Sequence, residues 1–343
     1  MFSGDQKIIN EARKLLHVRY LRTNPIRVTL ETSTSFDCHY QAISSMQKSV
    51  LVNWTSIQQR LTPYLFLLPA LLVLGLTVFY PALQAFYLSF TRYEYDLTQA
   101  PEWVGFANFQ RLWEDKVFWQ TLGNTILYLA IAVPILVAVP LILAILVNQK
   151  LHGMHWFRAA YYTPVIISMV VAGIAWRWLY AQNGLLNQLL KQTGILTSGI
   201  PWLTSPKFAL FSVIAVTVWK GLGYYMVIYL AGLQSIPAEL YEAAAIDGSD
   251  GVRKHWDVTV PLMRPYLMLV GVISAISATK VFEEIYIMTK GGPRNSSKTI
   301  VYYLYEQAFG SSLDISYACT IGLVMFLIIL VLSILNLKLS PKN

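Results

Sequence analysis

The sequence is poor in charge, in cysteine and in clustered basic residues. Its 343 residues include 26 Lys+Arg and 18 Asp+Glu, so that 13% are charged, whereas a soluble domain carries about 25%. Two cysteines, Cys38 and Cys319, do not suffice for a disulfide scaffold or a metal cluster. Despite a net charge of +8, no run of five or more basic residues occurs, which argues against nucleic-acid binding. With 55% hydrophobic residues, the sequence indicates a multi-pass membrane protein.

The sequence also lacks the motifs of common catalytic sites. It has no Gly-x-x-x-x-Gly-Lys-Ser/Thr loop, and therefore no usual cradle for ATP. It has no His-Glu-x-x-His, no Gly-x-Ser-x-Gly and no paired intramembrane aspartates, which argues against an intramembrane enzyme. The histidines cluster only as His152 and His155 in a short loop. We therefore expect no catalytic residue, no metal and no cofactor in this chain.

Long stretches without charge predict six membrane-spanning helices, because a helix needs roughly 20 apolar residues to cross the hydrocarbon. The fourth is interrupted by Lys220, and the fifth by Lys280, Glu283 and Glu284. The predicted helices are 63–90, 119–148, 159–180, 208–231, 266–288 and 315–337. Basic residues in the loops are divided too evenly to fix the orientation of the chain.

The first 60 residues differ from the rest of the chain. Residues 1–60 have no long apolar stretch next to their basic start, so they are not a secretory signal. We expect a cytoplasmic extension that is poorly ordered or forms an amphipathic helix on the inner leaflet. A change of character near Met46 also raises the hypothesis that translation begins there. Residues 61–343 then form the membrane domain.

A polar segment, 232–265, separates the fourth and fifth predicted spans. Ser235 is a candidate N-cap, and Pro237 suits the first turn of a short helix. Gly248 can adopt the left-handed conformation that ends it. A second short helix is expected to stop before Pro261. The segment thus predicts a helix–turn–helix whose alanine-rich face, around Ala243, allows close approach to a partner.

In this segment the sequence closely resembles the EAA signature of binding-protein-dependent ABC transporter permeases. Ser249 stands where that family often has alanine, and His255 where it usually has phenylalanine, with Trp256 adjacent. The residues at the family's spacing are Glu242, Ala243, Ala244, Asp247, Gly248, Pro261 and Pro265. The resemblance implies an all-α, six-helix type I importer domain with a cytoplasmic coupling helix. The coupling helix docks on a separate ATP-hydrolysing subunit, and Glu239 lies at its start.

The resemblance covers nearly everything from about residue 60 to the end. Segments such as Ala231–Pro237 and Thr289–Pro293, followed by Tyr302 and Tyr305, look like the carbohydrate-uptake branch. This implies a sugar-importing permease of a bacterial cytoplasmic membrane, with both termini cytoplasmic. The implied partners are a second related permease, two ATPase subunits that bind ATP and magnesium, an extracytoplasmic solute-binding protein and membrane lipid. In this family the choice of solute resides largely in the binding protein.

Polar residues inside two predicted spans are candidates for the solute pathway, because intramembrane charge usually faces a cavity or a partner. Hydroxyls can bond to sugar OH groups, and rings can stack on sugar C–H faces. The candidates on the fifth span are Ser274, Ser277, Val281 and Glu284, and those on the fourth are Lys220, Tyr224 and Tyr225. The spacing also allows a salt bridge from Lys280 to Glu283 or Glu284. Alternatively, these charges snorkel to the outer interface and the serines pack helices.

A second function remains open from the residues alone. The charges within the fifth span would also suit a channel or a secondary transporter driven by an ion gradient. Against this alternative, the span pattern shows no inverted repeat. Uptake that needs ATP and a binding protein would distinguish the importer from a gradient-driven transporter.

Overall fold

The computed structural model describes residues 62–93, 100–149, 152–194 and 198–339. The predicted N-terminal extension, 1–60, and the hypothesis about Met46 lie outside the described residues. The chain divides into two units, Met1–Leu76 and Thr77–Asn343. The described part of the first unit is helical from Thr62 onward. The second unit contains all the candidate residues discussed below.

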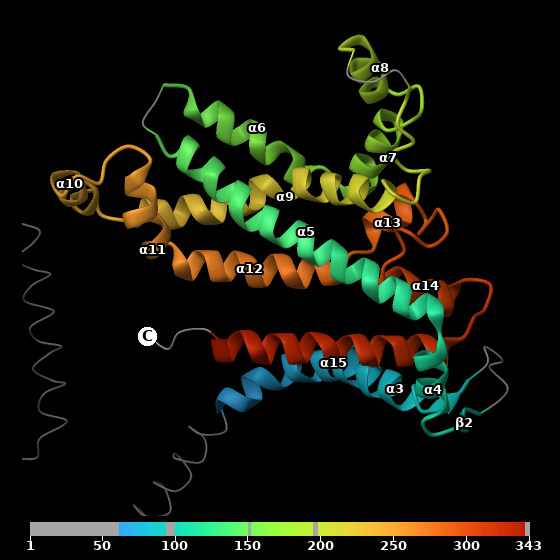
Figure 1. Ribbon diagram of the computed structural model, residues 1–343. Helices are drawn as coiled ribbons and strands as arrows, with labels where there is room; N and C mark the ends of the chain where they lie inside the picture. The colour runs from blue at the N-terminus through green and yellow to red at the C-terminus, as the bar shows by residue number, and fades with distance from the viewer. Residues whose placement is uncertain (1–61, 94–99, 150–151, 195–197, 340–343) are drawn as a thin grey trace, which may run out of the picture. The chain divides into compact units, whose positions relative to one another are not determined.

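The second unit is mostly helical (Figure 1). Its first half contains η1 (Gly75–Phe79, which begins in the first unit), α3 (Tyr80–Leu88), β1 (Thr91–Arg92), β2 (Glu102–Trp103), α4 (Ala107–Glu114), α5 (Lys116–Val147), α6 (Met154–Ile166), α7 (Met169–Leu179) and α8 (Leu185–Gln192). Its second half contains α9 (Ala209–Gln234), α10 (Ala238–Ile246), η2 (His255–Thr259), α11 (Val260–Leu262), α12 (Arg264–Thr279), α13 (Glu283–Met288), α14 (Ile300–Phe309) and α15 (Ile315–Leu339). The short antiparallel ribbon β1–β2 departs from the all-α expectation.

Several helices are long and apolar enough to cross a membrane. Helix Thr62–Leu88, α5 and α9 each pass this test alone, and they correspond to the predicted helices 63–90, 119–148 and 208–231. Two bent pairs, α6 with α7 and η2–α11 with α12, pass only as pairs and bend by 98° and 60°. Helix α15 matches the predicted helix 315–337 and has a shorter apolar stretch, Ile315–Val331.

The prediction of one continuous helix over 159–180 is wrong, because the chain breaks between α6 and α7. Ile167 is extended (φ −68°, ψ 132°), and the hydroxyl of Ser168 accepts a hydrogen bond from the amide of Val171 at 3.4 Å. Ser168 therefore acts as the N-cap of a new helix. Near the break, the ammonium group of Lys220 donates to the carbonyl oxygen of Val165 at 3.4 Å. The backbone near the bend thus gains a partner inside an apolar run.

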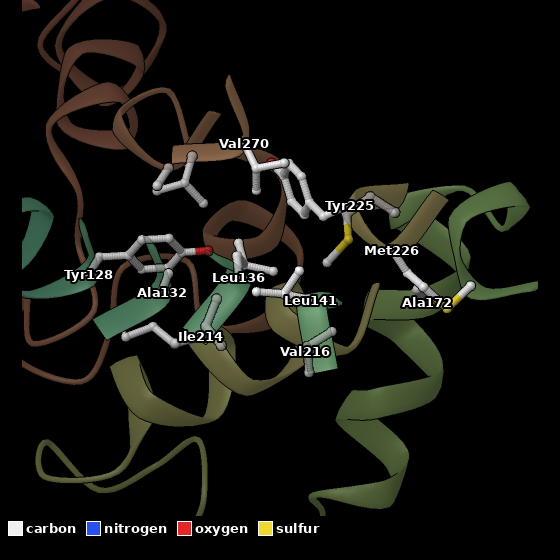
Figure 2. Close-up of a cluster of buried hydrophobic side chains, with 14 of the residues drawn as sticks. Tyr128, Ala132, Leu136, Leu141, Ala172, Ile214, Val216, Tyr225, Met226 and Val270 are labelled. Carbon is white, nitrogen blue, oxygen red and sulfur yellow. The ribbon is translucent and has the colours of Figure 1, made fainter. Parts of the chain in front are cut away.

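The main core lies where α5 packs against α9 and α12, with α6 packed against α9 (Figure 1). Its buried side chains include Tyr128 and Leu136 from α5, Tyr225 and Met226 from α9, and Val270 from α12 (Figure 2). These residues are apolar on the faces that meet, so their burial stabilises the contact by dispersion as well as by exclusion from solvent.

The contact of α6 with α9 depends on a glycine. A Cβ atom at Gly223 of α9 would lie 2.2 Å from the carbonyl oxygen of Tyr161 on α6. No real Cβ tolerates such a distance, so the two backbones approach this closely only because position 223 has no side chain.

A second, smaller core joins α4, the start of α5, α14 and α15. It contains Leu112, Phe118, Ile300, Tyr303 and Tyr317. Helix α3 also packs on α15, beside this cluster (Figure 1). The cluster ties the segments at one end of the unit, away from α10, into a common structure.

Candidate functional site

The predicted helix in segment 232–265 forms as α10, at one end of the helical unit (Figure 1). Pro237 is its N-cap residue (φ −59°, ψ 140°), and Glu239 lies in its first turn, where the helix dipole favours a carboxylate. No residue of α10 is buried. The helix therefore presents almost its whole circumference to the surroundings.

A glycine turn ends α10 as the sequence predicts. Gly248 has φ +80°, a left-handed conformation that glycine adopts without strain. Its amide donates to the carbonyl of Ala245 at 3.1 Å, and the amide of Ser249 donates to that of Ala244 at 2.8 Å. The hydroxyl of Ser249 donates to the carboxylate of Asp257 at 2.6 Å. Position 249, alanine in many relatives of the resembled family, here anchors the turn through its hydroxyl.

Two details of the prediction for this segment are wrong. Ser235 does not cap α10, because its hydroxyl donates to the carbonyl of Gly232 at 2.7 Å and Ser235 ends α9 instead. The second helix does not stop before Pro261, since η2 continues directly into α11, which contains that proline. Pro261 falls in the first turn of α11, where the missing amide hydrogen costs little.

Hydrogen bonds between side chains hold α10 against the returning helix. The hydroxyls of Tyr241 on α10 and Thr259 on η2 lie 3.0 Å apart. The Nδ1 atom of His255 lies 3.1 Å from the same Thr259 hydroxyl. Thr259 is fully buried. Helix α10 and η2 therefore form one small body at the junction of α9 with α12.

This body carries exposed apolar side chains. Ile246 is 86% exposed, Val252 75% and Trp256 69%. Leu240 on α10 is also exposed. A group of large exposed apolar side chains around a polar loop is typical of a surface that binds another protein. Trp256 supplies apolar surface next to His255, which is half-buried.

The predicted coupling residues gather on this body, with one exception. Glu239, Glu242, Ala243, Asp247 and Gly248 are all exposed on α10 and its turn. Ala244 is half-buried on the same helix. Pro261 is exposed on α11, away from the turn itself.

The fifth predicted span, 266–288, is wrong as a continuous helix. Helix α12 ends at Thr279 and α13 begins at Glu283. The hydroxyl of Thr279 donates to the carbonyl of Ala275 at 2.8 Å, a contact that tends to bend helices. The salt bridge that the sequence allowed from Lys280 to Glu283 or Glu284 is absent from the ion pairs of the described residues.

The backbone at this break is held by a distant loop. The hydroxyl of Thr299 donates to the carbonyl of Val281 at 3.1 Å. The side-chain amide of Asn124 on α5 donates to the carbonyls of Asn295 and Lys298, at 2.8 and 2.9 Å. Thr299 is fully buried. The loop 289–299 is thus fixed both to α5 and to the interrupted helix.

The predicted pathway residues lie on α9, on α12 and at the break, but they do not share one exposed face. Ser277 and Tyr224 are exposed, whereas Tyr225, Ser274 and Val281 are buried. The hydroxyl of Ser274 donates within its own helix, to Gly271 at 3.1 Å. The rings of Tyr224 and Tyr225 meet edge to face at 5.2 Å.

Half-buried Lys220 and Glu284 complete the predicted set. The carboxylate of Glu284 on α13 interacts electrostatically with Lys220 on α9. The hydroxyl of Tyr128 on α5 donates to Thr217 at 2.6 Å. A polar pair, Tyr128 and Thr217, therefore joins α5 to α9, and Glu284 lies at the start of α13, next to the break in the fifth span.

One polar group at the far end of the unit was missed by the sequence reasoning. The carboxylate of Asp115, the N-cap of α5, accepts hydrogen bonds from the hydroxyls of Tyr303 and Tyr317 at 2.5 and 2.6 Å. Burial by itself would raise the pKa of Asp115. The hydrogen bonds from Tyr303, Tyr317 and the Val117 amide outweigh burial, so the pKa of Asp115 lies below its ordinary value. An aspartate directly before a long apolar run is an N-cap signal that would have found it.

Comparisons with known proteins agree with this architecture. A family model described as "Binding-protein-dependent transport system inner membrane component" matches residues 115–343. The lactose transport system permease protein of Rhizobium radiobacter is 34% identical over 276 residues, covering 80% of this chain and 92% of that protein. An arabinooligosaccharides transport system permease protein of Halalkalibacterium halodurans is 34% identical over 286 residues, covering 82% and 88%.

A solved structure has the same fold. It is a bacterial alginate ABC transporter in complex with an alginate pentasaccharide-bound periplasmic protein. One of its chains matches with a TM-score of 0.73 at 22% identity, covering 84% of this chain and 96% of that chain.

Proposed function

Because the chain belongs to the family of binding-protein-dependent transport system inner membrane components, we propose that it is the permease subunit of an ATP-driven importer of a sugar or sugar-like solute. The names of the relatives, which refer to lactose and arabinooligosaccharides, support a carbohydrate. The exposed helix α10, with apolar side chains around it, carries the proposal. Family membership favours this function over the alternative of a channel or ion-gradient-driven transporter.

Helix α10 is the coupling helix in this proposal. The chain contains no phosphate-binding loop, so a partner must hydrolyse the ATP. Ile246, Val252 and Trp256 insert into a cleft of that ATPase subunit, and Glu242 pairs with one of its basic groups. Since α9 leads into α10 and η2 leads back towards α12, a displacement of the docked helix moves both spans.

The remaining parts of the assembly follow from this role. Two ATPase subunits carry ATP and magnesium, a second related permease completes the pathway, and an extracytoplasmic binding protein delivers the solute. Helix Thr62–Leu88, α5, the pair α6–α7, α9, α12 with the residues that follow it, and α15 form six spans in the cytoplasmic membrane of a bacterium. With α10 inside the cell, both termini are cytoplasmic, and residues 1–60 form a cytoplasmic extension to the membrane domain 61–343.

The solute passes the break in the fifth span. Ser277 and Tyr224 are accessible from outside the protein in this conformation, and Lys220 and Glu284 are half-buried. Ser274, Val281 and Tyr225 are buried here and contact the solute only after α12 moves relative to α9. Alternating access of this kind needs two states, which closure of the ATPase subunits biases.

Reconstitution tests the function directly. The chain is purified with its co-expressed permease, ATPase and binding protein and placed in proteoliposomes, and uptake of labelled sugars is measured. We expect uptake only with ATP inside and binding protein outside. Uptake driven by a proton or sodium gradient without ATP would contradict the proposal. A complex that lacks the ATPase but still accumulates sugar would contradict it equally.

A further inference from the structure

Two adjoining polar cavities open at the end of the unit that carries α10. The larger, of about 530 Å³, lies between the end of α5, the start of α6 and the end of α9. The smaller, of about 170 Å³, lies between α5, α9, α10 and the segment leading into η2. Asn148 and Gln149, which follow α5, line both cavities. The two cavities therefore adjoin at the side chains of Asn148 and Gln149, and together we call them the depression.

Several of the side chains that line the depression are cationic or carry an imidazole ring. Among the described residues that line either cavity there is no carboxylate. The cationic or imidazole side chains around it are His152, His155, Arg158, Lys254 and His255, which we call the basic basin. Arg158 and Lys254 are cationic at neutral pH, and the imidazoles of the histidines can donate hydrogen bonds, so that the lining is suited to an anion.

Arg158 is held in place for such a role. Its Nε and Nη2 atoms donate to the carbonyl oxygen of Val147, at 3.2 and 2.8 Å. This contact caps the end of α5, where a cation is favoured by the helix dipole. A guanidinium group carries five N–H donors, so donors remain for a ligand in the cavity. The contact with Val147 fixes the direction in which they point.

Backbone geometry adds to the positive potential. Helix α6 starts at the basin, and its N-cap residue, Gly153, has φ +86° and no side chain that could satisfy the first amides. The free amides at a helix start favour an anion. Apolar Ile145 and Leu233 also line the smaller cavity. A phosphate at the basin would thus meet cations and amides above apolar walls.

We propose that the basic basin binds the phosphate group of an anionic ligand, either the headgroup of a membrane lipid or a soluble phosphate ester. Basic pockets between membrane helices at the cytoplasmic side are suited to lipid headgroups. The assignment of this end to the cytoplasm rests on the proposed function, but phosphate binding itself does not. The basin spans α6, which carries His155 and Arg158, and the start of η2, where Lys254 and His255 lie.

Binding is measured on the full-length chain in lipid nanodiscs, without any transport assay. One arm compares nanodiscs of phosphatidylcholine alone with an equimolar mixture of phosphatidylcholine and phosphatidylglycerol, and native mass spectrometry counts retained anionic lipid. The other arm titrates inorganic phosphate and glycerol 3-phosphate into the phosphatidylcholine nanodiscs and follows the phosphorus NMR signal. The variants are Arg158→Gln and Lys254→Gln. The controls are Arg253→Gln, which removes the neighbouring exposed cation paired with Asp257, and Lys191→Gln on α8.

We expect each basin variant to weaken binding about tenfold, since one charge-assisted hydrogen bond to phosphate contributes about that factor. The control variants should bind like the unaltered chain. Loss confined to the phosphatidylglycerol arm identifies a lipid, and loss confined to the titration identifies a soluble ester. Because Arg158→Gln also removes a helix cap, Lys254→Gln is decisive if the first variant fails to fold. Unchanged binding in Lys254→Gln, or no binding in either arm, overturns the proposal. Neither result bears on ATP-driven uptake.

Discussion

The hydroxyl of Tyr317 on α15 donates a hydrogen bond to the carboxylate of Asp115 at the start of α5, across 2.6 Å and 202 positions of sequence. The same oxygen accepts the hydroxyl of Tyr303 on α14, and the other carboxylate oxygen accepts the amide of Val117. Arg111 lies over the Tyr317 ring, 4.1 Å from its centroid, and pairs with Asp314 at 2.6 Å. One carboxylate thus joins three helices at the end of the unit opposite α10.

Replacing Asp115 by asparagine should destabilise the protein. Asparagine still caps a helix, but it cannot accept two hydroxyls with a full negative charge. We expect the free energy of unfolding to fall by about 2 kcal/mol. Thermal unfolding in detergent micelles measures the change. Glu114→Gln, one residue earlier and exposed, is the matched control and should be neutral. Equal stability of the two variants would contradict the assigned role of Asp115.

The same carboxylate predicts a pH dependence. Its pKa is lowered in the folded state, so its contribution to stability is complete above the unfolded value of about 3.9 and is lost as the pH falls through the folded value. The unaltered protein should therefore exceed Asp115→Asn in stability at neutral pH, and the difference should shrink in acid below about pH 4. Parallel unfolding curves at several pH values measure it. A difference that does not vary with pH would show that the charge of Asp115 is unimportant.

Gly248→Ala tests the turn after α10. At φ +80° an L-residue is strained by about 1–2 kcal/mol, although a Cβ atom there would meet no neighbouring atom. We expect the membrane spans to fold normally and the ATPase activity stimulated by binding protein to fall several-fold, because the coupling helix shifts. Gly123→Ala on α5, which also meets no neighbour and has no positive φ, should leave that activity unchanged. Full stimulation of the ATPase in Gly248→Ala would show that coupling does not depend on the left-handed turn at position 248.

Ile246→Glu tests the apolar surface around α10. The side chain is 86% exposed, so the change should leave the stability of the isolated chain unaltered. In the assembled transporter it would bury a charge in the proposed ATPase cleft, and we expect the ATPase subunit to dissociate during size-exclusion chromatography. Leu185→Glu on α8, exposed at the other end of the unit, is the control. Retention of the ATPase by Ile246→Glu would exclude this face as the docking surface.

Thr299→Val removes the hydroxyl that binds the Val281 carbonyl at the break in the fifth span. The buried carbonyl would lose its partner, at a cost of about 1–3 kcal/mol. Hydrogen exchange should accelerate at the break between α12 and α13. The hydroxyl of Thr193 donates to the carbonyl of Leu190 in an exposed turn, and Thr193→Val should change neither the free energy of unfolding nor the hydrogen exchange at the break. Unchanged exchange in Thr299→Val would mean that the loop does not hold the break.

Hydropathy sufficed to predict α5 and α15, because each follows a long apolar run, and α9, because a single charge, Lys220, interrupts its run. It did not predict the breaks at Ile167 and at Lys280–Phe282. Hydropathy reports composition and carries no information about backbone direction. A serine inside an apolar run, Ser168, was the available signal for the first break.

In segment 232–265 the residues with special backbone demands were predicted best. Gly248 takes the left-handed conformation that its position required. Ser235 was assigned to the wrong helix, because a serine between two helices can serve either the end of one or the start of the next. The contact of Thr299 with Val281 joins residues of two different elements, and only the tertiary structure reveals it.

The contact of Thr299 with Val281 joins the loop 289–299 to the break in the fifth span. The loop is bound to α5 through Asn124 and to the interrupted helix through Thr299. If a molecule bound to the loop changes the affinity of the break for a solute, the solute changes the affinity of the loop for that molecule by the same factor. In the proposed importer, binding of a partner to the loop 289–299 and binding of the solute at the break would then strengthen or weaken each other by one common factor.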